Sequence, residues 1–393
     1  MIVREKYLKE IRPFYDSDLV KIITGIRRCG KSVILKTIYD EIAKITDNII
    51  YLDFEDAINL KKAGSVELLL SYVDQNRNEG KCYIFLDEVQ NVKDWAIAVK
   101  TLRLHNNSVF ISGSNSKLLS KEFATELSGR YVSFRIRPFV YKEIIEYSKQ
   151  IGKTISTTDY LIWGGFPKRF DMENSESTVR YLKDLEDTIV IKDLIKRYKI
   201  KKPDLFIKFV NFVLRNNSRI LSARSIHKYL VGQGVECSSN TILGYMHYLK
   251  EAYVIEELPQ YSTKVKRELN YNPKVYNSDV CFNSLKVDNK RYDLDHNLEN
   301  IVYNELEYMG YDLKVFDSKG KEIDFIAMKN GKTYFVQTAY SVVDEKAYKR
   351  EFGAFADLDN SNQKILITND AIDYSTSTVR HIKLDDFLLM EEL

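Results

Sequence analysis

The chain has 393 residues, and a typical domain length of about 150 residues indicates two or three domains. Hydrophobic residues make up 44% of the sequence and charged residues 29%, which excludes long disorder, collagen and a small disulfide scaffold. The net charge of +3 is too small to indicate a class of partner, so any basic surface must be local.

The cysteines and the N-terminal segment indicate a cellular compartment. Cys29, Cys82, Cys237 and Cys281 lie far apart and form no CxxC pair, which is typical of a reducing cytosol. The N-terminal segment lacks the apolar run of a signal peptide, and no stretch approaches the roughly 18 apolar residues of a spanning helix. We therefore expect a soluble cytoplasmic protein with no membrane partner.

Residues 19–155 alternate short apolar runs with amphipathic segments, a pattern typical of a parallel sheet flanked by helices. The predicted strands are 19–24, 48–53, 81–87 and 109–112. The predicted helices between them are 31–45, 65–75 and 95–104.

A phosphate-binding loop follows the first predicted strand. The sequence GIRRCGKS at 25–32 matches GxxxxGK[ST] in full, with an apolar strand before it and a helical pattern after it. Gly25 and Gly30 let the backbone curl so that its N–H groups surround phosphate oxygens at a helix start. Lys31 would place a positive charge at the β- and γ-phosphates of ATP, and the Ser32 hydroxyl would ligate Mg²⁺.

The other side chains of this loop are further candidates. Arg27 and Arg28 are each expected to contact nucleotide or a neighbouring subunit, or simply to be solvated. Oxidation of Cys29 would block nucleotide, but a small inert residue is the preferred interpretation. The predicted nucleotide-binding set is Gly25, Arg27, Arg28, Cys29, Gly30, Lys31, Ser32 and Val33.

A second motif begins about 55 residues later, where an apolar strand ends in Asp87 and Glu88. This is a Walker B pattern. Asp87 would hold Mg²⁺ through water, and Glu88 would polarise the attacking water as a general base.

Two further positions are predicted to assist hydrolysis. The fourth strand runs into Ser114 and Asn115, and a polar side chain there would lie between the two motifs and orient the attacking water; the two residues are equally placed. Arg130 precedes the strand-like segment 131–139 and is a candidate finger for the γ-phosphate of a neighbouring subunit, with a surface arginine as the alternative.

The middle of the chain is predicted to be helical. Residues 156–202 have a helical pattern with a basic end, and Pro203 marks a linker. Three short helices then precede an extended segment, with a tight turn before the third helix, which is the order of a winged helix-turn-helix.

Local charge favours DNA as the partner of this winged helix. Residues 201–270 contain eleven Lys or Arg against six Asp or Glu, and such a patch supplies salt-dependent affinity for phosphates. Docking of a protein is the alternative. The possible groove-facing and wing residues are Ser239, Asn240, Thr241, Tyr245, His247, Lys264, Lys266 and Arg267.

These motifs resemble a widespread prokaryotic family of AAA+ superfamily ATP-binding proteins. The resemblance rests on GIRRCGKS, FLDEVQNVKDW, SGSNSKLLS, LSGRYVSFRIRPF, WGGFP, LENIVYNEL and EIDF. It implies an archaeal-type AAA+ ATPase core, a winged helix and a restriction-endonuclease-like fold. It also implies that Lys31, Ser32, Asp87 and Glu88 bind and hydrolyse nucleotide, and it places Arg130 at a Gly-Arg of the family.

The C-terminal part has a predicted helix at 297–309 and predicted strands at 312–316, 322–327, 333–337 and 364–368. Nucleases of the PD-(D/E)xK type need an acid from a helix, an Asp on one strand and Glu-x-Lys on the next, so that carboxylates hold Mg²⁺. The helix acid would be Glu299 or Glu305, and the strand acid would be Asp324.

The third nuclease element departs from this pattern. Gln337 and Ala339 stand where the glutamate and the lysine belong, and Lys346 on the following helix is a substitute for the lysine only if it is not simply solvated. We therefore expect a nuclease fold without cleavage, retained as a docking or structural domain.

The predicted fold is α/β: a P-loop NTPase (AAA+) parallel sheet flanked by helices, then a winged helix-turn-helix and a PD-(D/E)xK-like α/β domain. The predicted boundaries are 1–155 (ATPase core), 156–203 (helical lid or linker), 204–271 (winged helix) and 272–393 (endonuclease-like domain).

The expected function is Mg²⁺-dependent ATP hydrolysis by a homo-oligomer, such as a hexameric ring, coupled to DNA binding or remodelling through residues 201–270. One alternative is an ATP-operated switch that binds a protein or transcriptional partner, and a second is an ATP-gated, metal-dependent nuclease.

Overall fold

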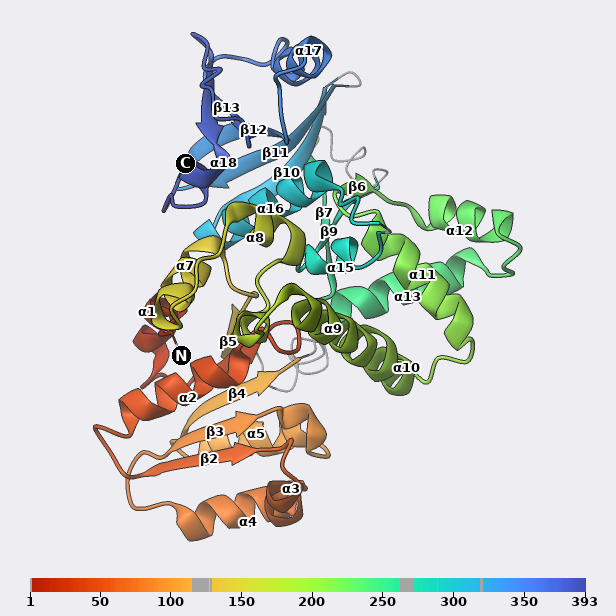
Figure 1. Cartoon of the computed structure of the whole chain (residues 1–393). Coiled ribbons are helices and arrows are strands. Elements are labelled where there is room, and N and C mark those ends of the chain that lie inside the picture. The colour runs from red at the N-terminus through yellow and green to blue at the C-terminus, as the bar shows by residue number, and fades with distance from the viewer. Residues whose placement is uncertain (1, 115–126, 128, 262–271, 288, 319–320) are drawn as a thin grey trace. The chain divides into compact units, whose positions relative to one another are not determined.

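The computed structural model describes residues 2–114, 127, 129–261, 272–287, 289–318 and 321–393, and Figure 1 shows their helices and strands. The chain divides into two compact units. Unit 1 consists of residues 1–138 with 251–253, and unit 2 consists of residues 139–250 with 254–393. The division into four domains, with boundaries at 155, 203 and 271, stays a prediction.

Unit 1 contains a five-stranded sheet, in the order β2-β3-β4-β1-β5, whose described strands are all parallel. Each predicted strand lies within two residues of an observed one. Strands buried on both faces of a parallel sheet form near-continuous apolar runs, which is why the sequence located them well. The strands are β1 Val20–Thr24, β2 Ile49–Asp53, β3 Tyr83–Asp87, β4 Ser108–Gly113 and β5 Tyr131–Arg135.

Helices cover both faces of this sheet because alternate residues of each strand face opposite sides. On one face, Ile22, Leu52, Ile84 and Ile111 pack with buried residues of α3, α4 and α5. On the other face, the ring of Tyr39 in α2 lies 5.7 Å from those of Tyr51 and Phe85. The helices of unit 1 are α1 Glu5–Ile11, η1 Arg12–Phe14, α2 Lys31–Ile42, α3 Ala57–Ala63, α4 Val66–Asn76, η2 Val89–Asn91 and α5 Trp95–Leu104.

Unit 2 begins with the helices predicted for 156–202, preceded by one that was not predicted. Polar caps begin several of them; the Asn174 side chain, for example, accepts a hydrogen bond from the Ser177 N–H (2.9 Å). A π-helical turn joins α9 to α10. The elements are α7 Tyr141–Gln150, α8 Thr157–Trp163, η4 Pro167–Asp171, α9 Ser175–Glu186, η5 Asp187–Lys192 and α10 Asp193–Tyr198.

Three helices and a three-stranded antiparallel sheet follow, with the strand order β6-β9-β7. Pro203 occupies the first position of its helix, where its missing N–H costs nothing. Ser222 caps the next helix by accepting from the Ser225 N–H (2.9 Å). The elements are α11 Pro203–Arg215, β6 Arg219–Ile220, α12 Ala223–Gly232, α13 Ser239–Glu251, β7 Ile255–Leu258 and β9 Lys274–Asn277.

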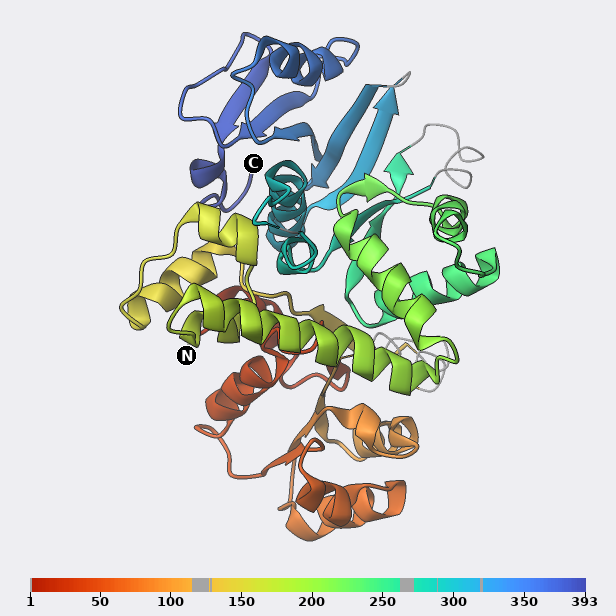
Figure 2. The same cartoon turned by 45° about the vertical axis from the view of Figure 1, so that its right-hand side comes forward.

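The C-terminal part contains a six-stranded mixed sheet in the order β14-β13-β12-β11-β10-β8. β10, β11 and β12 pair antiparallel, whereas β13 and β14 continue parallel to β12. α16 packs across β10, β11 and β12 (Figure 2). The elements are β8 Gln260–Tyr261, α15 Cys281–Ser284, α16 Leu294–Met309, β10 Asp312–Ser318, β11 Lys321–Lys329, β12 Lys332–Ala339, α17 Glu345–Ala354, β13 Gln363–Thr368, β14 Val379–Lys383 and α18 Leu384–Phe387.

All four cysteines are described by the structure and are free thiols, in agreement with the sequence. Across the described ranges, none of the helices has the length and apolar character needed to span a bilayer.

Candidate active site

The loop at 25–32 joins the carboxyl end of β1 to the N-terminus of α2. Gly25 and Gly30 have φ angles of 141° and 106°. A Cβ atom on Gly25 would lie 2.1 Å from the carbonyl oxygen of Ile136, so only glycine fits there. A Cβ atom on Gly30 would make only an ordinary contact, 3.7 Å from the Arg4 Nη1 atom, so there the positive φ alone favours glycine. The first N–H groups of α2 have no partner within the helix and are therefore available to an anion.

The structure brings Lys31 and Glu88 together at this loop. The Lys31 Nζ atom donates to the Ile26 carbonyl oxygen (3.3 Å) and lies 3.7 Å from the Glu88 Oε1 atom. Their side chains are only 2% and 10% exposed. Glu88 has a φ angle of 49°, an uncommon conformation for glutamate that turns the chain directly after β3.

Two hydroxyl groups hold the Asp87 carboxylate. The Tyr51 hydroxyl donates to Oδ2 (2.9 Å) and the Ser112 hydroxyl donates to Oδ1. The Ser112 oxygen also accepts from the Glu88 N–H (3.1 Å), so it links both acidic residues. Because β4 lies between β1 and β3, the end of β4 reaches the space between the loop and these acids.

Sequence analysis did not identify Ser112 or Tyr51. The polar residue that orients the attacking water was predicted at Ser114 or Asn115. Ser114 is buried, and Asn115 lies outside the described residues. The signal that the sequence offered was the position of Ser112 near the end of the apolar strand β4, in register with Ile23 of β1.

Asp53 is a further acid at this edge of the sheet. It ends β2 and lies in register with Asp87. Burial, together with the nearby charge of Asp87, raises the pKa of Asp53. Burial and the same charge also raise the pKa of Tyr51, so its hydroxyl stays protonated and can donate.

The remaining loop residues have different surroundings. Arg27 pairs with Glu55 (2.8 Å), whereas Arg28 is exposed and has a φ angle of 69°. Cys29 is buried, and burial raises the pKa of its thiol, which supports its interpretation as inert. The Arg4 guanidinium donates to the carbonyl oxygen of Cys29 (3.1 Å) and so helps to fix the conformation of the loop. Ser32 is exposed, and Val33 is half-buried, both at the start of α2.

Arg130 lies at the amino ends of the strands, whereas the loop lies at their carboxyl ends. The Val20 N–H donates to the Arg130 carbonyl oxygen (3.1 Å), so Arg130 is beside the first residue of β1, whereas the loop follows the last. Five residues of strand span about 16 Å. The exposed Arg130 side chain is therefore too far away to contact a nucleotide bound to its own chain.

A second group of acidic residues lies in the six-stranded sheet region of unit 2. The Lys274 Nζ atom lies 2.6 Å from Glu299, 2.6 Å from Glu322 and 3.0 Å from Asp324, and its side chain is 4% exposed. Burial opposes the charge, but the three carboxylates raise the pKa of Lys274 well above its usual value. The other Asp324 oxygen accepts from the N–H (2.9 Å) and hydroxyl (2.8 Å) of Thr338.

This geometry decides between the two helix acids. Glu299 faces Asp324, whereas Glu305 accepts hydrogen bonds elsewhere, from the Tyr141 N–H (2.9 Å) and the Tyr160 hydroxyl (3.1 Å). Gln337 is a structural link, since its Oε1 accepts from the Asp324 N–H (3.1 Å) and its Nε2 donates to Glu351 (2.8 Å).

The cation of this cluster is therefore Lys274 in β9. Lys346 is exposed on α17, and Ala339 brings no charge. Sequence reasoning missed Lys274 because it is 25 residues from Glu299 and 50 from Asp324, so only the tertiary structure joins them.

The candidate groove-facing residues of α13 divide into two groups. Tyr245 is buried, with its ring 5.0 Å from Phe206 and 5.4 Å from Phe209, so the expectation that it faces a groove is wrong. Thr241 is half-buried, and Ser239, Asn240 and His247 are exposed. Lys264, Lys266 and Arg267 lie outside the described residues.

Comparisons with known proteins agree with the geometry of unit 1. Residues 17–145 match the AAA domain family, and residues 155–290 match a domain of unknown function (DUF8612). An uncharacterized protein of Haemophilus influenzae is 32% identical over 380 residues, which cover 94% of this chain and 93% of that protein. An uncharacterized protein of Methanocaldococcus jannaschii is 30% identical over 375 residues, with coverage of 89% and 82%.

One solved structure supports the fold. The Walker-type ATPase of Pyrococcus abyssi aligns with a TM-score of 0.50 and 14% identity, covering 72% of this chain and 95% of that one. At this identity the likeness concerns the fold alone.

Proposed function

The chain belongs to the same family of AAA-domain proteins as its relatives in Haemophilus influenzae and Methanocaldococcus jannaschii, and from this premise we propose that it is a Mg²⁺-dependent ATPase that engages DNA. One observation carries the proposal. The carboxyl ends of the parallel strands bring together the loop at 25–32, Lys31 and the Asp87–Glu88 pair. Ser112 is hydrogen-bonded to both acids.

The residues present fit a nucleotide and its metal ion. Gly25 and Gly30, which have positive φ angles and no side chains, let the loop curl, and Lys31 supplies a cation beside it. Ser32 and Asp87 would hold Mg²⁺, which supplies neutralisation of phosphate charge when it is bound. Glu88 would take the proton of the attacking water.

Hydrolysis is proposed to need a second copy of the chain. Arg130 is exposed at the edge of the sheet opposite its own loop, so it can serve a nucleotide only on a neighbouring chain. An arginine from a neighbour stabilises the charge that develops on the transferred phosphoryl group. We therefore assign a homo-oligomer, such as a ring, to the active enzyme.

DNA engagement is proposed for residues 201–270. The order α11, β6, α12, α13, β7, β9 with one antiparallel sheet supports a winged helix. The exposed residues Asn240, Leu243, His247 and Lys250 recur along one stripe of α13, and this stripe is the proposed groove-facing surface.

The C-terminal sheet is proposed to dock rather than to cut. A nuclease of this type needs carboxylates that are free to hold Mg²⁺. Here the Lys274 ammonium already lies where Glu299, Glu322 and Asp324 would hold a metal ion, and Gln337 replaces the next acid. The wild-type chain should therefore leave DNA intact in Mg²⁺ or Mn²⁺.

Nucleotide binding and phosphate release, measured separately, test the ATPase proposal. Lys31→Ala should weaken ATP binding, whereas Glu88→Gln should keep binding and lose turnover about 100-fold. Lys44→Ala, an exposed lysine beyond α2, is the matched control and should behave as wild type. If the wild-type chain binds ATP tightly but releases no phosphate, the ATPase proposal fails and a nucleotide-operated switch replaces it.

A further inference from the structure

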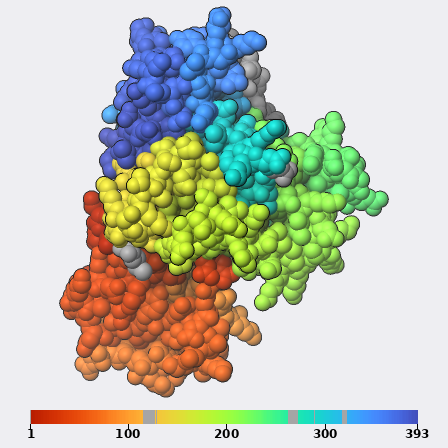
Figure 3. Space-filling view, in the orientation of Figure 1, coloured from red at the N-terminus to blue at the C-terminus, as the bar shows by residue number. Residues whose placement is uncertain are grey.

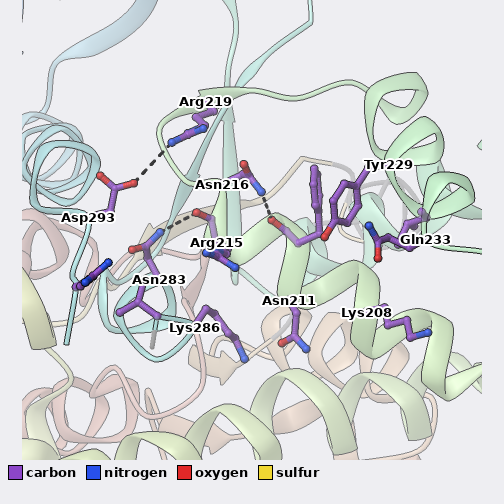
Figure 4. Close-up of a pocket in the computed structure, with 14 residues that line it drawn as sticks. Lys208, Asn211, Arg215, Asn216, Arg219, Tyr229, Gln233, Asn283, Lys286 and Asp293 are labelled. Atoms are coloured by element: carbon purple, nitrogen blue, oxygen red, sulfur yellow. Dashed lines mark hydrogen bonds and ion pairs between the residues drawn. The ribbon is translucent and has the colours of Figure 1, made fainter. Parts of the chain in front are cut away.

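A pocket of about 980 Å³ lies in unit 2, and its lining includes no residue of the exposed stripe of α13 or of the Lys274 cluster. Its lining comes from α11, from β6, from α12, and from α15 with the segment that follows it (Figure 4). In the space-filling view the surfaces of α11–α13 (green) and of residues around 281–293 (teal) adjoin (Figure 3). The function proposed above gives this pocket no role.

The pocket carries an excess of positive charge. Five cationic side chains line it against one carboxylate, that of Asp293; the cations are Lys208, Arg215, Arg219, Lys286 and Arg291. Acids neutralise two of them, because Lys286 pairs with Glu186, and Arg219 lies 3.7 Å from Asp293.

Three cations remain available to a ligand. Lys208, Arg215 and Arg291 are exposed, and among the described residues none of them pairs with a carboxylate. Lys208 and Arg215 are seven residues apart on α11, about two turns, so they lie on one side of the helix (Figure 4). They therefore offer two positive charges about 10 Å apart along the helix axis.

An aromatic surface lies beside these charges. The rings of Phe212 and Tyr229 also line the pocket, with their centroids 4.2 Å apart and their planes tilted by 34°. Phe212 is half-buried and supports Tyr229, whose side chain remains 47% exposed. A large exposed ring beside unpaired cations suits a ligand that combines a flat apolar group with an anion.

We propose that this pocket binds a single-stranded nucleic-acid segment, with phosphates on Lys208, Arg215 and Arg291 and an unstacked base on Tyr229. Single strands are favoured over duplex because a base within a duplex is already stacked and cannot reach the ring. The proposal extends the DNA engagement proposed above, but it rests neither on ATP hydrolysis nor on the exposed stripe of α13.

Fluorescence anisotropy with a labelled single-stranded oligothymidine, measured without nucleotide, tests this site. Tyr229→Leu keeps the contact with Phe212 but removes the ring, and it should weaken binding about 10-fold. Arg215→Ala should weaken binding and reduce the slope of log affinity against log salt concentration by about 0.7. Both variants should keep an unchanged unfolding temperature, which shows that they fold.

Lys228→Ala and Arg224→Ala are the matched controls. Both residues are exposed on α12 but do not line the pocket, so their substitution should change binding less than 2-fold. Equal losses in the controls and in the pocket variants would overturn the proposal in favour of diffuse charge. Unchanged binding by Tyr229→Leu and Arg215→Ala would overturn it too. Displacement of the labelled strand by an equal concentration of duplex DNA or of free thymidine phosphate would also overturn it.

Discussion

Ser112 connects the two acidic residues of the candidate active site. Its hydroxyl donates to Asp87 and its oxygen accepts from the Glu88 N–H (3.1 Å), so one small side chain fixes the orientation of both. Lys31, 3.7 Å from Glu88, approaches the same pair from the loop. The positions of these groups therefore depend on a residue that need not contact the nucleotide itself.

Ser112→Ala should lower ATP turnover about 10- to 100-fold while ATP affinity changes less than 3-fold. Loss of the hydroxyl leaves a buried Asp87 oxygen and the Glu88 N–H without a partner, which costs about 1–3 kcal/mol. Steady-state turnover and equilibrium binding of ATP check the split between the two effects. Ser112→Thr keeps the hydroxyl and should recover most of the activity; equal loss in both variants would contradict this role.

Lys274 is the cation on which the acid cluster of unit 2 depends. Lys274→Met should lower the free energy of unfolding by about 3–5 kcal/mol, because it removes the cation shared by the buried Glu299 and Asp324 and the partly exposed Glu322. Urea denaturation of the full chain checks this, with Lys346→Met on exposed α17 as the control. A loss below about 1 kcal/mol would show that the cluster is not held together by this ammonium.

At the scale of single residues, the sequence predicted the site where the contacts are local. The loop at 25–32 and the Asp87–Glu88 pair are contiguous motifs, so their spacing alone identifies them. The contacts of Ser112, Tyr51 and Lys274 join residues that are between 24 and 50 positions apart in the sequence. No local sequence pattern predicts such contacts.

At the scale of elements, the strands were predicted well because burial imposes apolar runs on them. Helix α5 lies at 95–104 as predicted, whereas α1 and α3 were not predicted. α3 is one short helix of seven residues with only Ala63 buried, so it has too weak an apolar stripe to be recognised.

Helix α16 places the buried carboxyl of Glu305 where, among the described residues, no salt bridge holds it. Burial raises the pKa of Glu305 to about 7, against an ordinary value of 4.5, and the nearby charge of Glu143 acts in the same direction. Between these two values the folded state keeps a proton that the unfolded state has lost. The free energy of unfolding should therefore fall as the pH rises from about 4.5 to about 7.

Glu305→Gln should remove this pH dependence, since the amide oxygen still accepts from Tyr141 and Tyr160. The difference in unfolding free energy between the variant and the wild type should change by about 3 kcal/mol across that pH window. Urea unfolding at several pH values measures it, with the exposed Glu146→Gln on α7 as the control. A constant difference across the window would show that Glu305 is ionised in the folded state.

At the scale of the whole molecule, the proposed finger role of Arg130 requires a second copy of the chain. Arg130 lies beside the first residue of β1 and the loop follows the last, so a finger at Arg130 could act only on a nucleotide bound to another copy. The sequence already predicted a finger that acts on a neighbouring subunit, and the parallel pairing of β1 and β5 gives the geometric reason why Arg130 could act only there.

Mixing two inactive variants tests this arrangement. Arg130→Ala keeps its loop and Lys31→Ala keeps its finger, and each alone should hydrolyse ATP at least about 100-fold more slowly than wild type. An equimolar mixture should recover activity, since some interfaces then combine an intact loop with an intact finger. Arg77→Ala, which alters an arginine beyond α4, is the control and should be active alone. If the mixture is as inactive as its components, Arg130 is a surface arginine and not a finger.

The most direct test of the account is phosphate release from ATP by wild type and Glu88→Gln, with and without single-stranded, double-stranded and branched DNA, at two salt concentrations. We predict that one form of DNA stimulates wild-type turnover, that added salt weakens the stimulation, and that Glu88→Gln binds ATP but releases almost no phosphate. Equal phosphate release by both proteins, or turnover that no DNA changes, would contradict a DNA-coupled ATPase.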